Sequence, residues 1–193
     1  MGALSLLCFP GYMGRFAGLD AQLFEEKVRS FGLFDEVETL APDYRKWAQK
    51  GFQDREFYSH LRYAKGVQDS GRALVAIGFS VGGFAALRIG AAARARGVLA
   101  LKPPVDLSDL RAGKGSLADF VRIDPVLAEL RTALIVYDES DRRKAHDPAQ
   151  AKAFERFPQI DVTSLYAFDI NEVMASGRLR AWLSAVIGPE GRF

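Results

Sequence analysis

Short apolar runs alternate with amphipathic stretches along most of the chain. The apolar runs cover residues 3–9, 36–41, 73–79, 97–103, 133–139 and 162–168. Between them, the spacing of apolar residues predicts helices near 18–31, 53–69, 82–96, 148–157 and 176–187. The central runs are nearly continuous in Val, Ile, Leu and Ala, which is typical of parallel strands covered on both faces. We therefore predict an α/β fold: a three-layer α/β/α sandwich around a mostly parallel sheet of about six strands.

The length of the chain and the absence of repeats within it favour a single domain. A chain of 193 residues can bury a substantial core, and it contains no internal repeat or low-complexity tract. Residues 104–131 fit the alternation least well, because they carry Gly113 and Gly115 within a polar stretch. We expect this segment to be an insertion that forms a small cap over a pocket, and we expect the tail at 188–193 to be frayed.

Composition narrows the classes of function. A formal charge of +2 is too small to predict nucleic acid as the main partner. No apolar run approaches the roughly 18 residues of a membrane-spanning helix, and no basic leading segment predicts a signal peptide, so we expect a cytoplasmic protein. Two histidines and one cysteine make no metal-ligand cluster, so neither a metal nor another cofactor is expected. Cys8 lies inside an apolar run and is predicted to be a buried core thiol.

The most informative segment reads Gly78-Phe79-Ser80-Val81-Gly82, which matches the pattern G-x-S-x-G. It joins a predicted strand directly to a helix rich in small residues, and this is the context that the motif requires. There the serine hydroxyl projects from a strained turn, and side chains at 78 and 82 would clash with neighbouring backbone. The alternatives are a chance glycine-rich turn or a phosphate-binding loop. The segment does not read G-x-G-x-x-G, however, and it follows the third apolar run instead of the first.

With this motif in place, the chain resembles the α/β-hydrolase superfamily over nearly its whole length. The residues LCFPGY at 7–12 resemble the loop that helps to form the oxyanion hole, with Phe9-Pro10-Gly11 where His-Gly commonly stands. Together with FEEKVRSFG at 24–32 and GFSVGG at 78–83, they are similar to FSH-type serine hydrolases and small bacterial esterases. The resemblance implies a nucleophilic Ser80 and an oxyanion hole formed by the backbone N–H groups of Tyr12 (or Met13) and Val81. Another interpretation of Pro10-Gly11 is a tight turn that merely ends the strand.

The same resemblance proposes a catalytic acid. The segment LIVYDESD at 134–141 resembles the penultimate strand of these enzymes and the turn that carries their acid. In that pattern the acid comes a few residues past the strand, which favours Asp141 over Asp138. The alternative is a surface aspartate that caps a turn.

The histidine departs from the family pattern. The last predicted strand, VTSLYAF, is followed by Asp169 where the family places its base, and the chain contains only His60 and His146. His60 lies in the middle of a predicted helix before the serine strand, so we interpret it as a structural or a surface residue. His146 lies in the loop after the acid strand, at the same sheet edge as Ser80, and is the candidate base. Its acid partner is Asp141 or alternatively Asp106, and either choice keeps the chain order Ser, Asp, His. The competing interpretation of His146 is a solvated loop residue.

Two further stretches bear on the substrate. Arg142, Arg143 and Lys144 flank the acid turn, where they could attract an anionic acyl carrier such as coenzyme A or phosphopantetheine; more often such a run is a solvated loop. Residues 44–58 are unusually aromatic and could form a wall of an acyl pocket, although packing between helices is the simpler explanation.

These patterns predict a serine hydrolase that cleaves a carboxylic ester or thioester through an acyl-enzyme on Ser80. The alternative is a catalytically impaired protein of the same fold that binds a small acyl ligand or a protein partner. A third hypothesis is a transferase, in which an acceptor other than water takes the acyl group.

Overall fold

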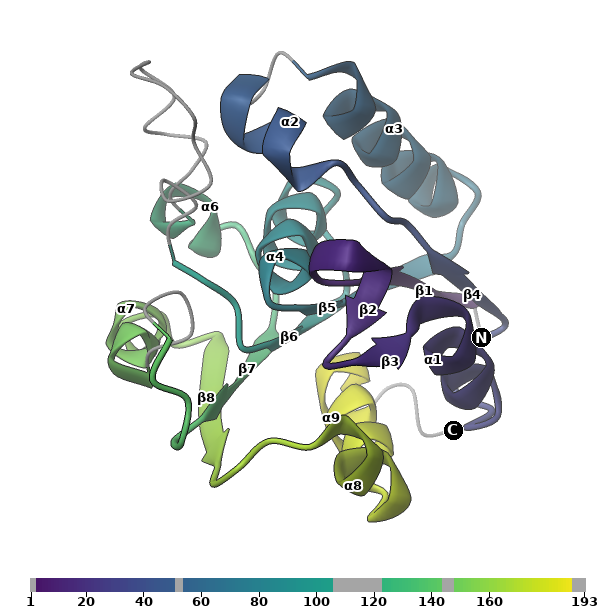
Figure 1. Ribbon diagram of the computed structural model, residues 1–193. Coiled ribbons are helices and arrows are strands. Elements are labelled where there is room, and N and C mark those ends of the chain that lie inside the picture. Colours follow the sequence, from purple (N-terminus) through teal and green to yellow (C-terminus); the bar gives the residue numbers. More distant parts are fainter. Residues whose placement is uncertain (1–2, 51–53, 106–122, 144–147, 189–193) are drawn as a thin grey trace.

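A computed structural model describes residues 3–50, 54–105, 123–143 and 148–188. Six strands form one parallel sheet in the order β4-β1-β5-β6-β7-β8 (Figure 1). The strands are β1 (Leu4–Phe9), β4 (Glu36–Thr39), β5 (Ala73–Phe79), β6 (Gly97–Leu101), β7 (Ala133–Asp138) and β8 (Ile160–Leu165). The predicted fold class, an α/β sandwich with a mostly parallel six-stranded sheet, is therefore confirmed.

Helices cover both faces of this sheet. One face carries α2 (Tyr44–Lys50), α3 (Arg55–Asp69), α4 (Val81–Ala92), α6 (Asp124–Leu127) and α7 (Lys152–Glu155). The other carries α1 (Ala21–Arg29), α8 (Ile170–Ala175) and α9 (Arg178–Ile187). Successive residues of a strand point to opposite faces, so Leu7 and Phe9 join the first core while Leu6 and Cys8 join the second. Every one of these four residues is almost fully buried, which explains the unbroken apolar run of β1.

The order of the strands identifies one special place in the sheet. From β1 the chain moves outward to β4 on one side, then crosses back to β5 on the other side of β1. The connection after β1 leads to α1 on one face, whereas β5 leads directly into α4 on the opposite face (Figure 1). Ligands of open parallel sheets bind outside the carboxyl ends of the strands at such a switch point. The topology therefore directs attention to the segments that follow β1 and β5.

Several short elements were not predicted from the hydrophobic pattern. After β1 the chain forms a 3-10 turn, η1 (Tyr12–Gly14), and a small antiparallel ladder of β2 (Arg15–Phe16) and β3 (Leu19–Asp20). Helices α2 and α8 and the short α6 were also missed, and the helix expected at 148–157 divides into a 3-10 turn, η5 (Pro148–Ala151), and α7. Elements of this length contain too few turns to show a period. The expected cap or insertion at 104–131 lies mostly outside the described residues, as does the tail at 189–193.

The last strand was placed too late in the sequence. The run VTSLYAF predicted a strand at 162–168, but β8 begins at Ile160 and ends at Leu165. β8 lies at the edge of the sheet and pairs only with β7, so its outward positions need not be apolar. Tyr166 beyond its end is 81% exposed, although it extends the apolar run. None of the described helices combines the length and the apolar composition needed to cross a bilayer.

The packing of α9 on β6 gives a first testable prediction. A Cβ at Gly97 in β6 would overlap the carbonyl oxygen of Val186 in α9, whereas a Cβ at Gly66 in α3 would meet nothing within 4 Å. We expect Gly97→Ala to destabilise the protein by about 2 kcal/mol, which lowers Tm by roughly 4–8 °C, because the helix must move away from the sheet. The matched control Gly66→Ala should raise stability by up to about 1 kcal/mol, because alanine favours the helix. Equal melting temperatures for the two variants would contradict the described packing.

Candidate functional site

Ser80 lies at the turn between β5 and α4, on the carboxyl edge of the sheet (Figure 1). Its backbone has φ 55° and ψ −125°, a combination that residues with a side chain rarely adopt. Its N–H donates to the carbonyl of Leu101 at the end of β6, and its own carbonyl accepts from Gly83 and Phe84 in the first turn of α4. Ser80 is only partly buried, so the strained turn presents it at the edge of the sheet.

Two glycines make this turn sterically possible. A Cβ at Gly78 would overlap the carbonyl of Gly82, and a Cβ at Gly82 would overlap the carbonyl oxygens of Phe9 and Pro10. At Gly82 the backbone of α4 therefore lies directly against the backbone at the end of β1, with no room for a side chain between them. This close approach joins the two segments that the topology singles out, and it explains why both positions lack a side chain.

The segment after β1 is held in place by its own contacts. The Gly11 N–H donates to the carbonyl of Arg15, and the buried Tyr44 hydroxyl donates to the carbonyl of Pro10 at 2.6 Å. Across the described ranges, neither the N–H of Tyr12 nor that of Val81 donates to a protein acceptor. Val81 is the first residue of α4, where an N–H has no partner within the helix. The two expected oxyanion donors thus flank the contact at Gly82, Tyr12 after the end of β1 and Val81 at the start of α4, and neither N–H has an acceptor within the described ranges.

Next to Ser80, a buried ionic cluster occupies the ends of β6 and β7. Lys102 directly follows β6, and its Nζ lies 3.0 Å from Asp138 Oδ2 and 2.6 Å from Asp141 Oδ2. Arg143 also binds the Asp141 carboxylate: its Nη2 lies 2.5 Å from Oδ2 and its Nε donates to Oδ1 at 2.9 Å. Asp138 also accepts hydrogen bonds from the backbone N–H and the hydroxyl of Ser140. The Lys102, Asp138 and Asp141 side chains are at most 8% exposed.

These contacts keep both carboxylates ionised. Hydrogen bonds from Arg143 hold the pKa of Asp141 well below its usual range, with burial opposing them and Lys102 reinforcing them. Burial alone would raise the pKa of Asp138, but the hydrogen bonds from Ser140 and Lys102 outweigh it and lower that pKa as well. Asp141 is therefore an anion at neutral pH, at the carboxyl edge of the sheet. Its partner Lys102 is a part of this cluster that the sequence reasoning missed. A lysine at the end of an otherwise apolar run was the signal that could have found it.

Only one of the two histidines, His60, lies within the described residues. His146 and the alternative acid Asp106 lie outside the described residues. Asp169, where the family places its base, accepts hydrogen bonds from the N–H groups of Asn171 and Glu172 and so caps α8. His60 lies in α3 with its ring 5.9 Å from that of Trp47 in α2, and burial lowers its pKa. That packing agrees with the structural role expected of His60.

The structure also gives the surroundings of three other predicted features. Three of the described aromatic residues of 44–58 pack helices together: Trp47 lies edge-on to Tyr44 and Phe57, and all three are nearly fully buried, whereas Tyr58 is half-exposed. Tyr44 also lines a cavity of about 250 Å³, together with Tyr12 and the segment 41–45.

Cys8 is a buried thiol whose pKa is raised by burial, as expected for a core residue. The basic loop is described only at Arg142, which is exposed, and at Arg143, which pairs with Asp141.

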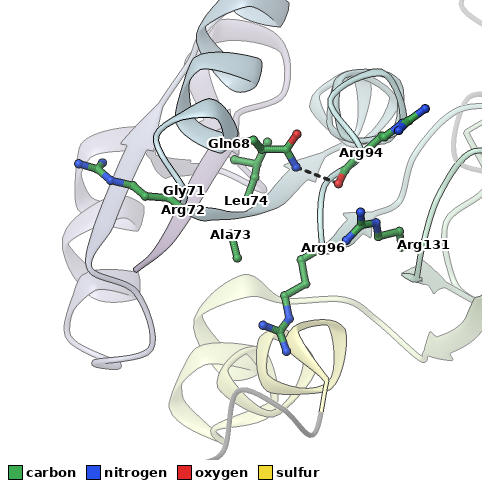
Figure 2. Close-up of a pocket in the computed structure, with 8 residues that line it drawn as sticks. All are labelled: Gln68, Gly71, Arg72, Ala73, Leu74, Arg94, Arg96 and Arg131. Atoms are coloured by element: carbon green, nitrogen blue, oxygen red, sulfur yellow. Dashed lines mark hydrogen bonds between the residues drawn. The ribbon is translucent and has the colours of Figure 1, made fainter. Parts of the chain in front are cut away.

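A second cavity, of about 390 Å³, lies at the opposite, amino edge of the sheet, where β5, β6 and β7 begin. Four arginines line it, at positions 72, 94, 96 and 131, but Figure 2 shows that their guanidinium groups spread in different directions. Arg72 pairs with Glu36, and Arg96 Nε donates to the carbonyl of Ile187. This cavity is remote from Ser80, because it lies across the full length of β5. Among the described residues, no group of three or more His, Cys, Asp or Glu side chains could hold a metal ion.

Comparisons with known proteins agree with this architecture. No family model matches the chain, and no curated protein is similar to it in sequence. Solved structures do match: Est1E from Butyrivibrio proteoclasticus has a TM-score of 0.62 at 17% identity, over 93% of this chain and 87% of that one. A monoacylglycerol lipase from Paleococcus ferrophilus has a TM-score of 0.59 at 12% identity, over 97% and 96% of the two chains. The thioesterase domain of the curacin biosynthetic pathway has a TM-score of 0.56 at 11% identity, over 95% and 93%. With its strand order and the turn at Ser80, the chain has the fold of the α/β-hydrolase superfamily.

Proposed function

We propose that the protein is a serine hydrolase that cleaves a carboxylic ester or thioester through an acyl-enzyme on Ser80. The observation that carries the proposal is the strained turn at Ser80, held by backbone contact between the start of α4 and the segment after β1. Strain of this kind costs of order 1–3 kcal/mol and clusters at active sites. Similar solved structures include a lipase and a thioesterase domain, which supports an ester or thioester as substrate.

In the proposed reaction, Ser80 Oγ attacks the carbonyl carbon of the substrate and gives its proton to a general base. The carbonyl oxygen becomes an oxyanion, which accepts hydrogen bonds from the N–H groups of Tyr12 and Val81. Both donors are unused by the described part of the protein, so they need not give up a hydrogen bond to serve it. The bond to the leaving alcohol or thiol then breaks, and that group takes the proton from the base. Water repeats the sequence to release the carboxylic acid and regenerate Ser80.

The base is proposed to be His146, with Asp141 as the acid that orients it. This assignment rests on the sequence position of His146 and on the ion pairs with Lys102 and Arg143 that keep Asp141 charged. Asp169 supports it indirectly, because the family's usual position for the base is taken here by a residue that caps α8. If no base serves Ser80, the protein is instead an impaired member of the fold that binds an acyl ligand.

A fluorophosphonate probe tests the nucleophile. The probe should label the folded wild-type protein at one site, because only a serine activated by its surroundings reacts at a useful rate. Ser80→Ala should abolish both the labelling and the hydrolysis of short-chain p-nitrophenyl esters while Tm stays within a few degrees of the wild-type value. Labelling that persists in Ser80→Ala would overturn the assignment, as would a wild-type protein with no more turnover than Ser80→Ala on esters and acyl thioesters.

The two histidines provide a matched test of the base. Hydrolysis by the wild type should rise through about pH 6–8, as an imidazole with a pKa near 6.5 loses its proton. His146→Ala should reduce kcat by roughly 10²–10⁴-fold, the usual contribution of a general base. His60→Ala should leave kcat and the pH profile unchanged, because His60 packs on Trp47 within α3 and α2. Full activity in His146→Ala would show that another group removes the serine proton.

Neighbouring glycines of α4 test the contact beneath Ser80. Gly82→Ala places a Cβ on the backbone oxygens of Phe9 and Pro10, at 2.0 and 2.4 Å, whereas the Cβ of Gly83→Ala meets tight but adjustable neighbours, the nearest being Pro103 Cβ at 3.1 Å. We expect Gly82→Ala to lose most of the probe labelling and about 1–3 kcal/mol of stability. Gly83→Ala should retain at least about half of the labelling, since a shift of a few tenths of an ångström accommodates its methyl group. Equal labelling of the two variants would count against a strict backbone contact at Gly82.

A further inference from the structure

Lys102 is the least expected residue at the carboxyl edge of the sheet. Its backbone has φ 52°, in the left-handed region that a residue with a side chain seldom adopts, and it directly follows the buried strand β6. Its side chain is only 5% exposed and ends between the carboxylates of Asp138 and Asp141. The chain therefore combines a strained backbone with a buried ammonium group at one position.

The buried cluster of Lys102, Asp138 and Asp141 is expected to add little to the stability of the fold. Burying a lysine and two aspartates carries a desolvation cost that their mutual attraction often fails to exceed, and an apolar side chain of similar volume is frequently as stabilising. The left-handed backbone at Lys102 adds a further cost, because its Cβ crowds the neighbouring carbonyl. Arg143 pairs with Asp141 from the solvent side, so the two carboxylates together face two cations. Such costs are more often found where a charge must be held at a fixed place for function.

The position of Lys102 relative to Ser80 is set by backbone hydrogen bonds. The Ser80 N–H donates to the carbonyl of Leu101, the residue before Lys102, at 2.8 Å, and the Lys102 N–H donates to the carbonyl of Val136 at 2.7 Å. The ends of β5, β6 and β7 are thus tied side by side, with Ser80 on the first and the Lys102–Asp141 ion pair on the next two. The Lys102 Nζ also lies 5.9 Å from the centre of the Phe168 ring, which stacks on Phe79 beside Ser80.

We propose that Lys102 is a positioning residue for the Ser80 site, where its ammonium group holds the Asp141 carboxylate in a fixed place at the sheet edge. This inference rests on the proposed serine hydrolase function. Lys102 acts through Asp141: two of the three N–H bonds of the ammonium are directed to carboxylates, and only the one at 2.6 Å reaches the residue in the acid position. Asp138 serves as the second anchor, which fixes the lysine side chain and is itself held by Ser140.

A double-mutant cycle separates this role from a general structural one. Lys102→Met keeps the length of the side chain and removes its charge, and Asp141→Asn removes the charge of its partner. We expect each single variant to lower kcat for a p-nitrophenyl ester by at least about tenfold with KM changed less than about twofold, because only the catalytic group is misplaced. The double variant should be no slower than Asp141→Asn alone. Losses that multiply in the double variant would overturn the proposal, since Lys102 would then act independently of Asp141.

The pH profile supplies a second readout. In the proposed mechanism, the acid limb of kcat reports the pKa of the base, His146. Loss of the Lys102 charge leaves the carboxylate of Asp141 less compensated, which raises the pKa of a histidine paired with it. The acid limb of kcat should therefore move to higher pH by roughly 0.5–1 unit in Lys102→Met. The charged groups that face Lys102 in the described structure are Asp138 and Asp141, with Arg143 on the far side of Asp141. An unshifted limb in a folded, slower Lys102→Met protein would indicate a purely structural role and contradict the proposal.

Asp138→Asn tests the inference even if Lys102→Met fails to fold. It removes the charge of the second anchor but leaves the ion pair between Lys102 and Asp141, so the fall in kcat should be clearly smaller than that of Asp141→Asn. A loss as large as that of Asp141→Asn would overturn the proposal. Probe labelling keeps the two hypotheses apart: a wild-type protein that is neither labelled nor active refutes the hydrolase function, whereas an active wild type with a fully active Lys102→Met variant refutes only the role of Lys102.

Discussion

The contact between the start of α4 and the segment after β1 is the constraint on which the rest of the site depends. Because Gly82 carries no side chain, the helix approaches the carbonyl oxygens of Phe9 and Pro10 directly. This approach fixes the direction in which α4 leaves β5, and with it the strained backbone of Ser80. It also brings the N–H groups of Tyr12 and Val81 to the same switch point of the sheet. A single backbone contact thus organises both the serine and its candidate oxyanion donors.

The second organising feature is electrostatic. The ends of β6 and β7 hold a buried lysine between two aspartates, and an arginine closes the pair toward solvent. Hydrogen bonds and cations hold both carboxylates in their charged form despite burial, so the edge next to Ser80 carries fixed charges of both signs. Fixed charges and dipoles can stabilise a transition state without reorganising, which is the usual basis of catalysis at such edges.

The position after β8, where a histidine base is usual in enzymes of this fold, is taken here by a residue that caps a helix. A family-like enzyme would carry a histidine after β8, but Asp169 at that place accepts two backbone N–H groups and begins α8. A histidine there would leave those helix N–H groups without the cap that aspartate supplies. In the proposed mechanism the base therefore comes from another loop of the carboxyl edge. Of the chain's two histidines, His60 in α3 packs against Trp47, which leaves His146 as the proposed base.

The sequence by itself determined the layer architecture, the number of strands in the sheet and the strand–turn–helix context of Ser80. These follow from local signals: unbroken apolar runs, helical spacing, and glycines at 78 and 82. Only the tertiary structure decided the order β4-β1-β5-β6-β7-β8 and the partners of Asp141, because both depend on which distant segments meet. The role of Lys102 could not be read from its neighbours in sequence, since a lysine that ends an apolar run is usually solvated. It became visible once β6 and β7 lay side by side and placed its ammonium group between two carboxylates that come 36 and 39 residues later in the chain.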